Sequence, residues 1–281
     1  MVDAGDPYRI ASYRDLRGEG MSRRSIREAV TTGHLFHARR DNYVLGSASE
    51  AVKTAVRVGG RVDCVSLMRE LGVFVLNDDG CTHVQIDRNH HWLRSARSRS
   101  VRLATDHSRV VTHWRSEGEA VWSAVSGVPA AIAQAVLCQS PRAAIATLDS
   151  ALNKRVLRVS DLREVFERLP HKLQRLRRYV DSRAEAGSET FARLAARTLG
   201  VPIELQVQIS GVGRVDLVLD GRVIVECDSR EFHGGWERQQ RDRERDLAAA
   251  ALGYATLRPT AVQLFTRPSL FLNAARGLLG G

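Results

Sequence analysis

The sequence predicts an α+β protein of several domains, and three observations carry this prediction. The chain has 281 residues, more than one typical small domain contains. Residues 10–45 contain the capping and turn residues expected of two short helices followed by a hairpin. The C-terminal hundred residues combine helical segments with short apolar strands. The expected parts are residues 1–57, a mixed α/β and helical middle region at 58–182, and a C-terminal domain at 183–281.

Charge is distributed unevenly along the chain. Lys and Arg number 42 against 32 acids, which gives a net charge of +10 and predicts a polyanionic partner. Residues 183–281 contain 13 arginines and 12 acids, a net of +1, so residues 1–182 carry the remaining +9. Only three of the basic residues are lysines, and the last of them is Lys172. Phosphate affinity is therefore expected in the first two thirds of the chain.

Several classes of protein are excluded by composition. The first ten residues are polar, which is unlike a signal peptide. The longest uncharged run, 120–141, is interpreted as a pair of buried helices broken near Pro129 rather than as a membrane span. The four cysteines are scattered without a CxxC pair, so neither a zinc site nor a disulfide framework is expected. Reduced thiols in the cytoplasm are expected instead.

The N-terminal segment begins with two capped helices. Ser12 and Ser22 are N-cap residues, and the sequence Gly18-Glu19-Gly20 separates the two helices. The apolar side chains of the second helix recur at helical spacing and are expected to face inward. They are Met21, Ile26, Ala29 and Val30. The opposite face would then carry Arg23, Arg24 and Arg27.

A basic hairpin follows these helices. Residues 34–39 and 43–45 alternate around a turn that places Arg39 and Arg40 near its tip. Two helices and a basic hairpin together predict a winged helix-turn-helix whose second helix enters the major groove of DNA, with Ser25 and the first-turn arginines as candidates for base contacts. The alternative is a small packing module with a solvated arginine face.

The middle region is predicted to be structural. Its expected elements are a connecting helix over 47–57, an apolar helical stretch over 61–76, strands over 82–87 and 110–115, and successive helices over 117–180. The loop between the strands contains five arginines, which either contact phosphates or are solvated. They are Arg88, Arg94, Arg97, Arg99 and Arg102. His90 and His91 are adjacent and lack the spacing of a metal-ligand pair.

The C-terminal domain is expected to alternate helices and strands. Glu189 opens a helix that Gly200 ends, and Asp220-Gly221 indicates a hairpin. The remaining elements are strands over 205–210, 214–219, 222–228 and 254–257, and helices over 239–252 and 269–279.

Acidic residues interrupt the apolar strands of this domain. Asp216 lies within the sequence VDLVL, and Glu226 and Asp228 alternate with apolar residues at the end of the next strand. Carboxylates on neighbouring strands repel each other unless a cation lies between them. Oxygen ligands of this kind suit Mg²⁺ (or Mn²⁺), and Glu189 could complete the site. The alternative is that these acids are ordinary exposed residues.

Two segments carry family resemblances. The stretch GMSRRSIREAVTTGHLFHARRDNYVLG resembles the N-terminal domain of AbiEi-type antitoxins. The stretches SETFARLAARTLG, GVGRVDLVLDGRVIVECDSREFH and RDRERDLAAAALGYATLRPT resemble the PD-(D/E)xK nuclease superfamily, and more narrowly its Vsr-like (very-short-patch-repair-related) endonuclease domains. The second resemblance covers roughly residues 187–260 and implies a restriction-endonuclease-like α/β/α domain.

The nuclease resemblance also implies roles for particular residues. Asp216 would be the principal metal ligand, with Glu226 and Asp228 beside it, and His233 would be the general base. A backing helix would contain Arg241, Asp242, Arg245 and Asp246. The catalytic lysine usual in the superfamily is absent, because Asp228 occupies its position and no lysine follows Lys172. Arginine does not lose its proton and cannot replace that base, which leaves His233.

These observations predict a DNA-binding, Mg²⁺-dependent endodeoxyribonuclease that hydrolyses phosphodiester bonds in the cytoplasm. Whether it serves DNA repair or defence is left open, as is an RNA substrate. The alternative is an antitoxin-like DNA-binding transcriptional regulator with a catalytically inactive nuclease fold. DNA is the expected partner and a membrane is not. A homodimer and a partner protein encoded nearby are left open.

Overall fold

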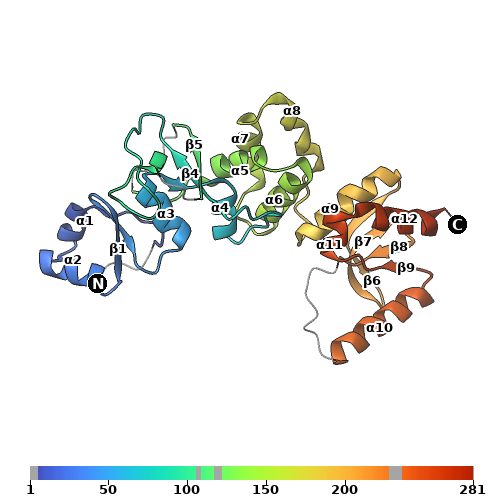
Figure 1. The fold of residues 1–281 in the computed structure, drawn as a ribbon. Coiled ribbons are helices and arrows are strands. Elements are labelled where there is room, and N and C mark those ends of the chain that lie inside the picture. The colour runs from blue at the N-terminus through green and yellow to red at the C-terminus, as the bar shows by residue number, and fades with distance from the viewer. Residues whose placement is uncertain (1–5, 106–108, 117–121, 228–235, 281) are drawn as a thin grey trace. The chain divides into compact units, whose positions relative to one another are not determined.

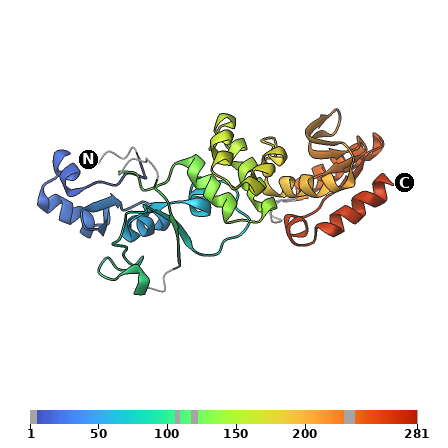
Figure 2. The same cartoon turned by 90° about the horizontal axis from the view of Figure 1, so that it is seen from above.

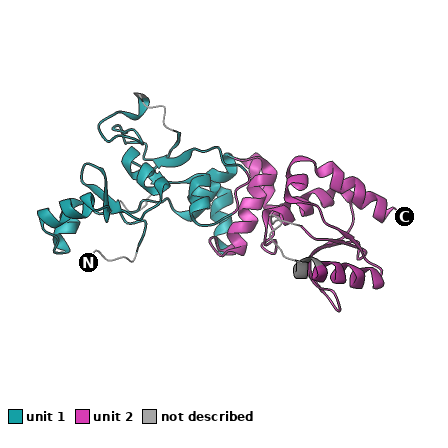
Figure 3. Cartoon of the chain, turned by 60° about the horizontal axis from the view of Figure 1, so that its bottom comes forward, with its two compact units in different colours: residues 1–73, 77–138, 160–169 teal, residues 74–76, 139–159, 170–281 magenta. Residues whose placement is uncertain are grey.

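The computed structural model describes residues 6–105, 109–116, 122–227 and 236–280. The chain forms two compact units (Figure 3). Unit 1 comprises 1–73, 77–138 and 160–169, and unit 2 comprises 74–76, 139–159 and 170–281. No described helix has the length and apolar character needed to cross a bilayer.

Unit 1 contains helices and two small sheets (Figure 1). Its elements are α1 (Tyr13–Gly18), α2 (Arg23–Thr31), β1 (Leu35–Arg39), β2 (Asn42–Leu45), α3 (Glu50–Val58), β3 (Arg61–Val62), α4 (Cys64–Glu70), β4 (Thr82–Ile86), β5 (Val110–Trp114), α5 (Val128–Leu137) and α7 (Leu162–Glu167).

The N-terminal helices and hairpin form as the sequence predicts (blue in Figures 1 and 2). The Ser12 hydroxyl accepts from the Asp15 amide in a capping box at α1, and the Ser22 hydroxyl accepts from the Ser25 amide at α2. Strands β1 and β2 pair antiparallel. Leu16 and Ile26 are buried in a core with the hairpin, and Met21, Ala29 and Val30 pack against this core, which confirms the inward face of α2.

The second sheet of unit 1 corrects the expected helix over 61–76. Its strand order is β3-β4-β5. Strand β3 pairs antiparallel with β4, and β4 pairs parallel with β5. Gly59 ends α3 in the left-handed region, and a Cβ on Gly60 would lie 2.1 Å from the Gln85 carbonyl oxygen. The backbone therefore approaches β4 closely enough to pair as a strand, and the helix begins only at Cys64.

The uncharged run over 120–141 also differs from expectation. Within its described residues, a single helix forms before Pro141, because α5 starts at Val128 with Pro129 in its first turn. Val125 instead forms a parallel bridge with Val62. Helix α5 packs against α4 and α7, so its apolar residues are buried within unit 1.

Unit 2 combines a four-stranded sheet with helices. Its elements are α6 (Pro141–Asn153), α8 (His171–Gln174), α9 (Gly187–Ala196), β6 (Ile203–Ile209), β7 (Gly213–Leu219), β8 (Val223–Val225), α10 (Trp236–Ala251), β9 (Ala255–Leu257), α11 (Ala261–Thr266) and α12 (Pro268–Leu279). The predicted strands and helices form, except that the strand expected over 222–228 is shorter, Val223–Val225, among the described residues, and α11 is an addition. A capping box at Thr260 starts α11.

The sheet of unit 2 has helices on both faces. Its strand order is β6-β7-β8-β9, antiparallel through β8 and parallel between β8 and β9. Leu217, Leu219 and Val225 share one core with α9, α11 and α12. Val218 and Ile224 point to the other face and pack with Ala249 of α10, which lies apart from the other helices in Figure 1.

A buried ion pair joins α6 to α9 within unit 2. Asp149 and Arg193 are 0% and 4% exposed, and Arg193 Nη2 lies 2.7 Å from Asp149 Oδ2. The Asp149 carboxylate also accepts from the Asp181 amide and the Thr190 hydroxyl. The boundary expected between residues 182 and 183 therefore lies inside unit 2, because α6, which precedes it, packs on α9, which follows it.

Candidate functional site

Asp216 lies on β7, and Glu226 directly follows β8, the neighbouring strand of the unit 2 sheet. The antiparallel register pairs Leu217 with Val225, and extending it by one residue pairs Asp216 with Glu226. Both acids are partly buried, and Asp216 Oδ2 accepts a 2.8 Å hydrogen bond from the Cys227 amide. Like charges directly opposite each other in a sheet are destabilising. The two predicted acids therefore meet in an arrangement that carries an electrostatic cost.

Glu189 and Gln206 extend this group of acids. Glu189, in the first turn of α9, is 4% exposed, and its Oε2 accepts from the Glu185 amide at 2.9 Å and from Gln206 Nε2 at 2.8 Å. The pairs on either side, Leu205 with Leu217 and Val207 with Val215, put Gln206 level with Asp216. Gln206 of β6, Asp216 of β7 and Glu226, directly after β8, thus form a row beside Glu189. Glu189, Gln206, Asp216 and Glu226 are called the acidic cluster below.

Gln206 is an unusual residue within the acidic cluster. Its φ of 53° lies in the left-handed region, where a side chain other than that of glycine is uncommon and costs about 1–3 kcal/mol. Its Oε1 is buried and has no hydrogen-bond partner among the described residues. A buried acceptor in this condition is destabilising, which indicates a ligand or a water at this point.

The electrostatics of the acidic cluster disfavour three ionised carboxylates. Burial, with a smaller contribution from the Asp216 charge, raises the pKa of Glu189 to about 7. Burial also raises the pKa of Asp216, although the hydrogen bond from the Cys227 amide opposes this change. The pKa of Glu226 is raised by burial and by Asp216, while Arg245 lowers it. A bound cation would relieve these repulsions.

Arg245 of α10 supplies the main positive charge at the acidic cluster. Its Nη2 lies 2.8 Å from Glu226 Oε1 and also donates to the Arg214 carbonyl oxygen, and its Nε donates to the Val212 carbonyl oxygen. These contacts hold the guanidinium beside the sheet. Asp246, the next residue, forms an ion pair with Arg258 at the end of β9. The helix that the sequence places behind the site is thus in contact with it.

The acidic cluster has the donor types of a hard divalent cation site, although its three carboxylates are not a group whose ligand atoms all lie within 4.8 Å of one another. Carboxylate and amide oxygens are the ligands that Mg²⁺ prefers, and one or two protein carboxylates suffice because the ion keeps several waters. Asp216 and Glu226 provide the carboxylates, and the buried Oε1 of Gln206 is an oxygen acceptor without a partner among the described residues. Asp228 and His233, the other predicted site residues, lie outside the described residues.

The predicted DNA-binding arginines of unit 1 differ in their surroundings. Arg23, Arg24 and Arg27 are exposed on α2, and Arg40 is exposed at the hairpin turn. Arg39 is half-buried and donates to the Trp92 carbonyl oxygen at 3.3 Å, with a weaker contact to that of Val58. The first four arginines are therefore available to a partner, while Arg39 holds the hairpin against the rest of unit 1.

A basic groove lies beside the hairpin. It has a volume of about 540 Å³, and its lining includes Lys53, Arg57, Arg97 and Arg99. Arg57 donates to the Ala96 carbonyl oxygen, and its guanidinium stacks on the Phe36 ring. These contacts connect the arginine-rich loop to α3 and the hairpin. The loop is thereby part of the basic surface of unit 1.

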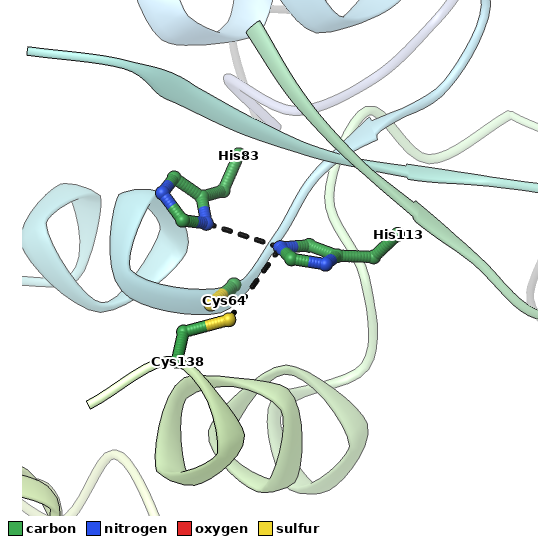
Figure 4. Close-up of side chains that lie close together, drawn as sticks. All are labelled: Cys64, His83, His113 and Cys138. Carbon is green, nitrogen blue, oxygen red and sulfur yellow. Dashed lines mark hydrogen bonds between the residues drawn. The ribbon is translucent and has the colours of Figure 1, made fainter. Parts of the chain in front are cut away.

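A second group of ligand side chains was not predicted from the sequence. Cys64, His83, His113 and Cys138 converge in unit 1 (Figure 4), with one ligand atom of each within 4.8 Å of the others. Among the described residues this is the one such group of three or more Cys, His, Asp or Glu side chains. The four residues are widely separated in the sequence, so no local spacing reveals them. The one sequence signal is that both histidines alternate with apolar residues in predicted strands.

Comparisons with known proteins identify no family and no relative from which a function would follow. No protein-family model matches the chain, and no curated protein matches it. The resemblances to a Vsr-like endonuclease domain and to an AbiEi-type winged helix therefore remain predictions from motifs.

Proposed function

We propose that this protein is a DNA-binding endonuclease that uses Mg²⁺ or Mn²⁺ at the acidic cluster to hydrolyse phosphodiester bonds. The observation that carries the proposal is the row of Gln206, Asp216 and Glu226 beside Glu189. Three carboxylates with raised pKa and an unsatisfied amide oxygen form a site that a divalent cation would stabilise. A restriction-endonuclease-like domain is part of this proposal.

Each residue of the acidic cluster has a distinct proposed task. A bound Mg²⁺ ion would polarise the scissile phosphate and lower the pKa of an attacking water. Asp216 and Glu226 would hold it, with Asp228 completing the predicted ligand set. Glu189 would complete the site, and Gln206 positions it through their hydrogen bond. His233 would accept the proton of the water, because imidazole is the side-chain type that ordinarily gains and loses a proton near neutral pH.

The basic surface of unit 1 would supply DNA affinity. We propose that α1, α2 and the β1–β2 hairpin act as a winged helix-turn-helix, with Arg23, Arg24 and Arg27 of α2 at the DNA. Supporting this, all three are exposed while the apolar face of α2 is packed in the core. The net charge is +3 in unit 1 and +7 in unit 2, so the exposed position of these arginines, rather than the net charge, supports phosphate contacts by α2.

Replacing Arg24 and Arg27 together with alanine should weaken DNA binding and reduce its salt dependence. Each lost phosphate contact lowers the slope of log K against log salt concentration by about 0.9, so the double variant should lose about 1.8. Fluorescence anisotropy over a salt series measures this slope. Arg163→Ala is the matched control, because Arg163 is exposed on α7 and paired with Glu167. An unchanged slope in the double variant would remove α2 from the DNA interface.

Cleavage assays test the proposed activity and its substrate. Purified full-length protein is incubated with Mg²⁺ or Mn²⁺ and duplex, nicked, mismatched or single-stranded DNA, and with RNA. The proposal expects metal-dependent cleavage of at least one DNA structure. Cleavage of RNA alone would replace DNA by RNA as the substrate, and no cleavage of any of them would contradict the endonuclease.

One observation favours the alternative of a DNA-binding regulator. Arg245 already neutralises part of the Glu226 charge through a 2.8 Å ion pair, and the usual catalytic lysine is absent. A fold that no longer binds metal could be stabilised in this way. The regulator would protect a defined operator in a footprinting experiment, and Asp216→Asn would leave that protection unchanged.

A further inference from the structure

The Cys/His cluster of unit 1 has the ligand set of a tetrahedral metal site, and its ligand atoms lie within 4.8 Å of one another. His83 Nδ1 lies 3.0 Å from His113 Nε2, which lies 4.0 Å from Cys138 Sγ. Zinc bonds of about 2.3 Å to sulfur and about 2.0–2.1 Å to nitrogen require ligand atoms about 3.3–3.8 Å apart in a tetrahedron. The two distances lie on either side of this range, so small side-chain rotations would bring these atoms to metal-binding geometry.

Four different elements bring the ligands together. His83 is on β4 and His113 on β5, and the parallel register pairs His83 with Val111. His113 follows Val111 by two residues, so both histidines project from the same face of the sheet. Cys64 is the first residue of α4, and Cys138 ends α5. Helices α4 and α5 pack against each other, which places both thiols at the histidines (Figure 4).

The surroundings of the cluster orient two of its ligands. His83 is 4% exposed, and its Nε2 lies 3.0 Å from Asp79 Oδ2. A hydrogen on Nε2 leaves the lone pair of Nδ1 directed at the cluster, which is the carboxylate–histidine arrangement found at zinc sites. Gln134 Nε2 donates to Cys138 Sγ at 3.5 Å. A hydrogen bond of this type stabilises a thiolate more than a thiol.

Cys64 is held at the cluster by an uncommon backbone conformation. Its φ of 53° lies in the left-handed region and its side chain is fully buried. Asp63, before it, makes no side-chain cap to α4 and instead pairs with Arg115 through both carboxylate oxygens. The conformation is costly in a residue other than glycine, and a bond to a metal would offset this cost.

We propose that Cys64, His83, His113 and Cys138 bind one Zn²⁺ ion in a closed, structural site. Four protein ligands leave no position for a substrate, and two thiolates with two imidazoles are a donor set typical of zinc. Binding converts the two thiols to thiolates and releases two protons, so the Cys₂His₂ site is neutral overall. The ion would cross-link α4 and the C-terminal end of α5 to strands β4 and β5. Cys138, at the exposed end of the site, is where the ion enters.

This zinc site is independent of the proposed nuclease activity. Its ligands all belong to unit 1, whereas the acidic cluster belongs to unit 2. Thiolates and imidazoles select zinc, and carboxylate oxygens select Mg²⁺. A failure of either proposal is therefore visible separately, because zinc content is measured without any cleavage assay.

Metal analysis of the full-length protein tests the zinc site. Protein expressed in medium with added zinc and purified without a chelator should contain one zinc ion per chain, as measured by inductively coupled plasma mass spectrometry. Replacement of zinc by Co²⁺ should produce the visible bands of a tetrahedral site and a thiolate-to-cobalt charge-transfer band. Cys138→Ser should lose both signals. Cys81→Ser is the control, because Cys81 is in the same unit but outside the cluster.

A milder variant guards against simple misfolding. Asp79→Asn leaves all four ligands in place and removes the carboxylate at His83, so it should bind zinc about 10–100-fold more weakly in a chelator competition. Three results would overturn the proposal. In the first, zinc-supplemented protein contains no bound metal and gives no Co²⁺ spectrum. In the second, Cys138→Ser binds as much zinc as the parent protein. In the third, mass spectrometry after alkylation finds a Cys64–Cys138 disulfide.

Discussion

Asp216→Asn should reduce metal-dependent DNA cleavage by at least about 10³-fold. Asparagine has the shape of aspartate and can still accept the hydrogen bond from the Cys227 amide, so the local fold should remain. It removes the charge that is proposed to hold the cation, and the charge stabilisation supplied by a catalytic metal amounts to several kcal/mol. Each 1.36 kcal/mol corresponds to about tenfold in rate. Initial rates at saturating Mg²⁺ measure the effect.

The control for this variant is another acid of the same sheet. Glu204 is exposed on β6, and Glu204→Gln should retain the full cleavage rate. Thermal unfolding shows whether both variants fold like the parent. Cleavage by Asp216→Asn at the rate of the parent protein would place the active site elsewhere.

The second large effect concerns stability. Arg193→Met should lower the free energy of unfolding of unit 2 by about 3–5 kcal/mol, because it leaves Asp149 buried without its cation. Burial raises the pKa of Asp149, and Arg193 lowers it. Without Arg193 the pKa in the folded protein rises further above that of the unfolded chain. Stability is then lost as the pH rises through this higher pKa, so the cost should be smallest near pH 4 and largest at neutral pH.

Urea unfolding at several pH values checks this prediction. Arg222→Met is the matched control, since the ion pair of Arg222 with Asp220 is exposed and should contribute at most about 1 kcal/mol. The double variant Asp149→Leu/Arg193→Met removes both buried charges and should recover part of the loss. A cost for Arg193→Met that equals the control, or that falls as the pH rises, would contradict the account.

Local signals explain which parts of the fold could be predicted. Ser12 and Ser22 cap the helices they precede, and Gly200 ends a helical turn in the left-handed region, because capping depends on residues only a few positions apart. Strand β3 was missed because its pairing depends on the close approach of Gly60 to the distant β4, which an apolar helical pattern does not reveal.

The candidate sites divide in the same way. Asp216 and Glu226 could be predicted, because Asp216 interrupts the apolar strand β7, Glu226 follows the apolar strand β8, and a hairpin connects the two strands. Gln206 could not, since its place opposite Asp216 and its hydrogen bond to Glu189 arise only when β6 pairs with β7. The scattered cysteines were interpreted as unlike a zinc site. Cys64 and Cys138 meet only through the packing of α4 on α5, which no spacing rule describes.

The acidic cluster as a cation site is the central claim, and Mn²⁺ binding tests it more directly than cleavage, which also depends on the choice of substrate. Electron paramagnetic resonance measures free Mn²⁺ during titration of the full-length protein after its metal content has been determined. We expect one Mn²⁺ site per chain, and we expect Mg²⁺ to compete with Mn²⁺ for it. The Asp216→Asn variant should lose this site, and the Glu204→Gln variant should keep it. Equal Mn²⁺ binding by the parent protein and Asp216→Asn, or no binding by either, would contradict the account.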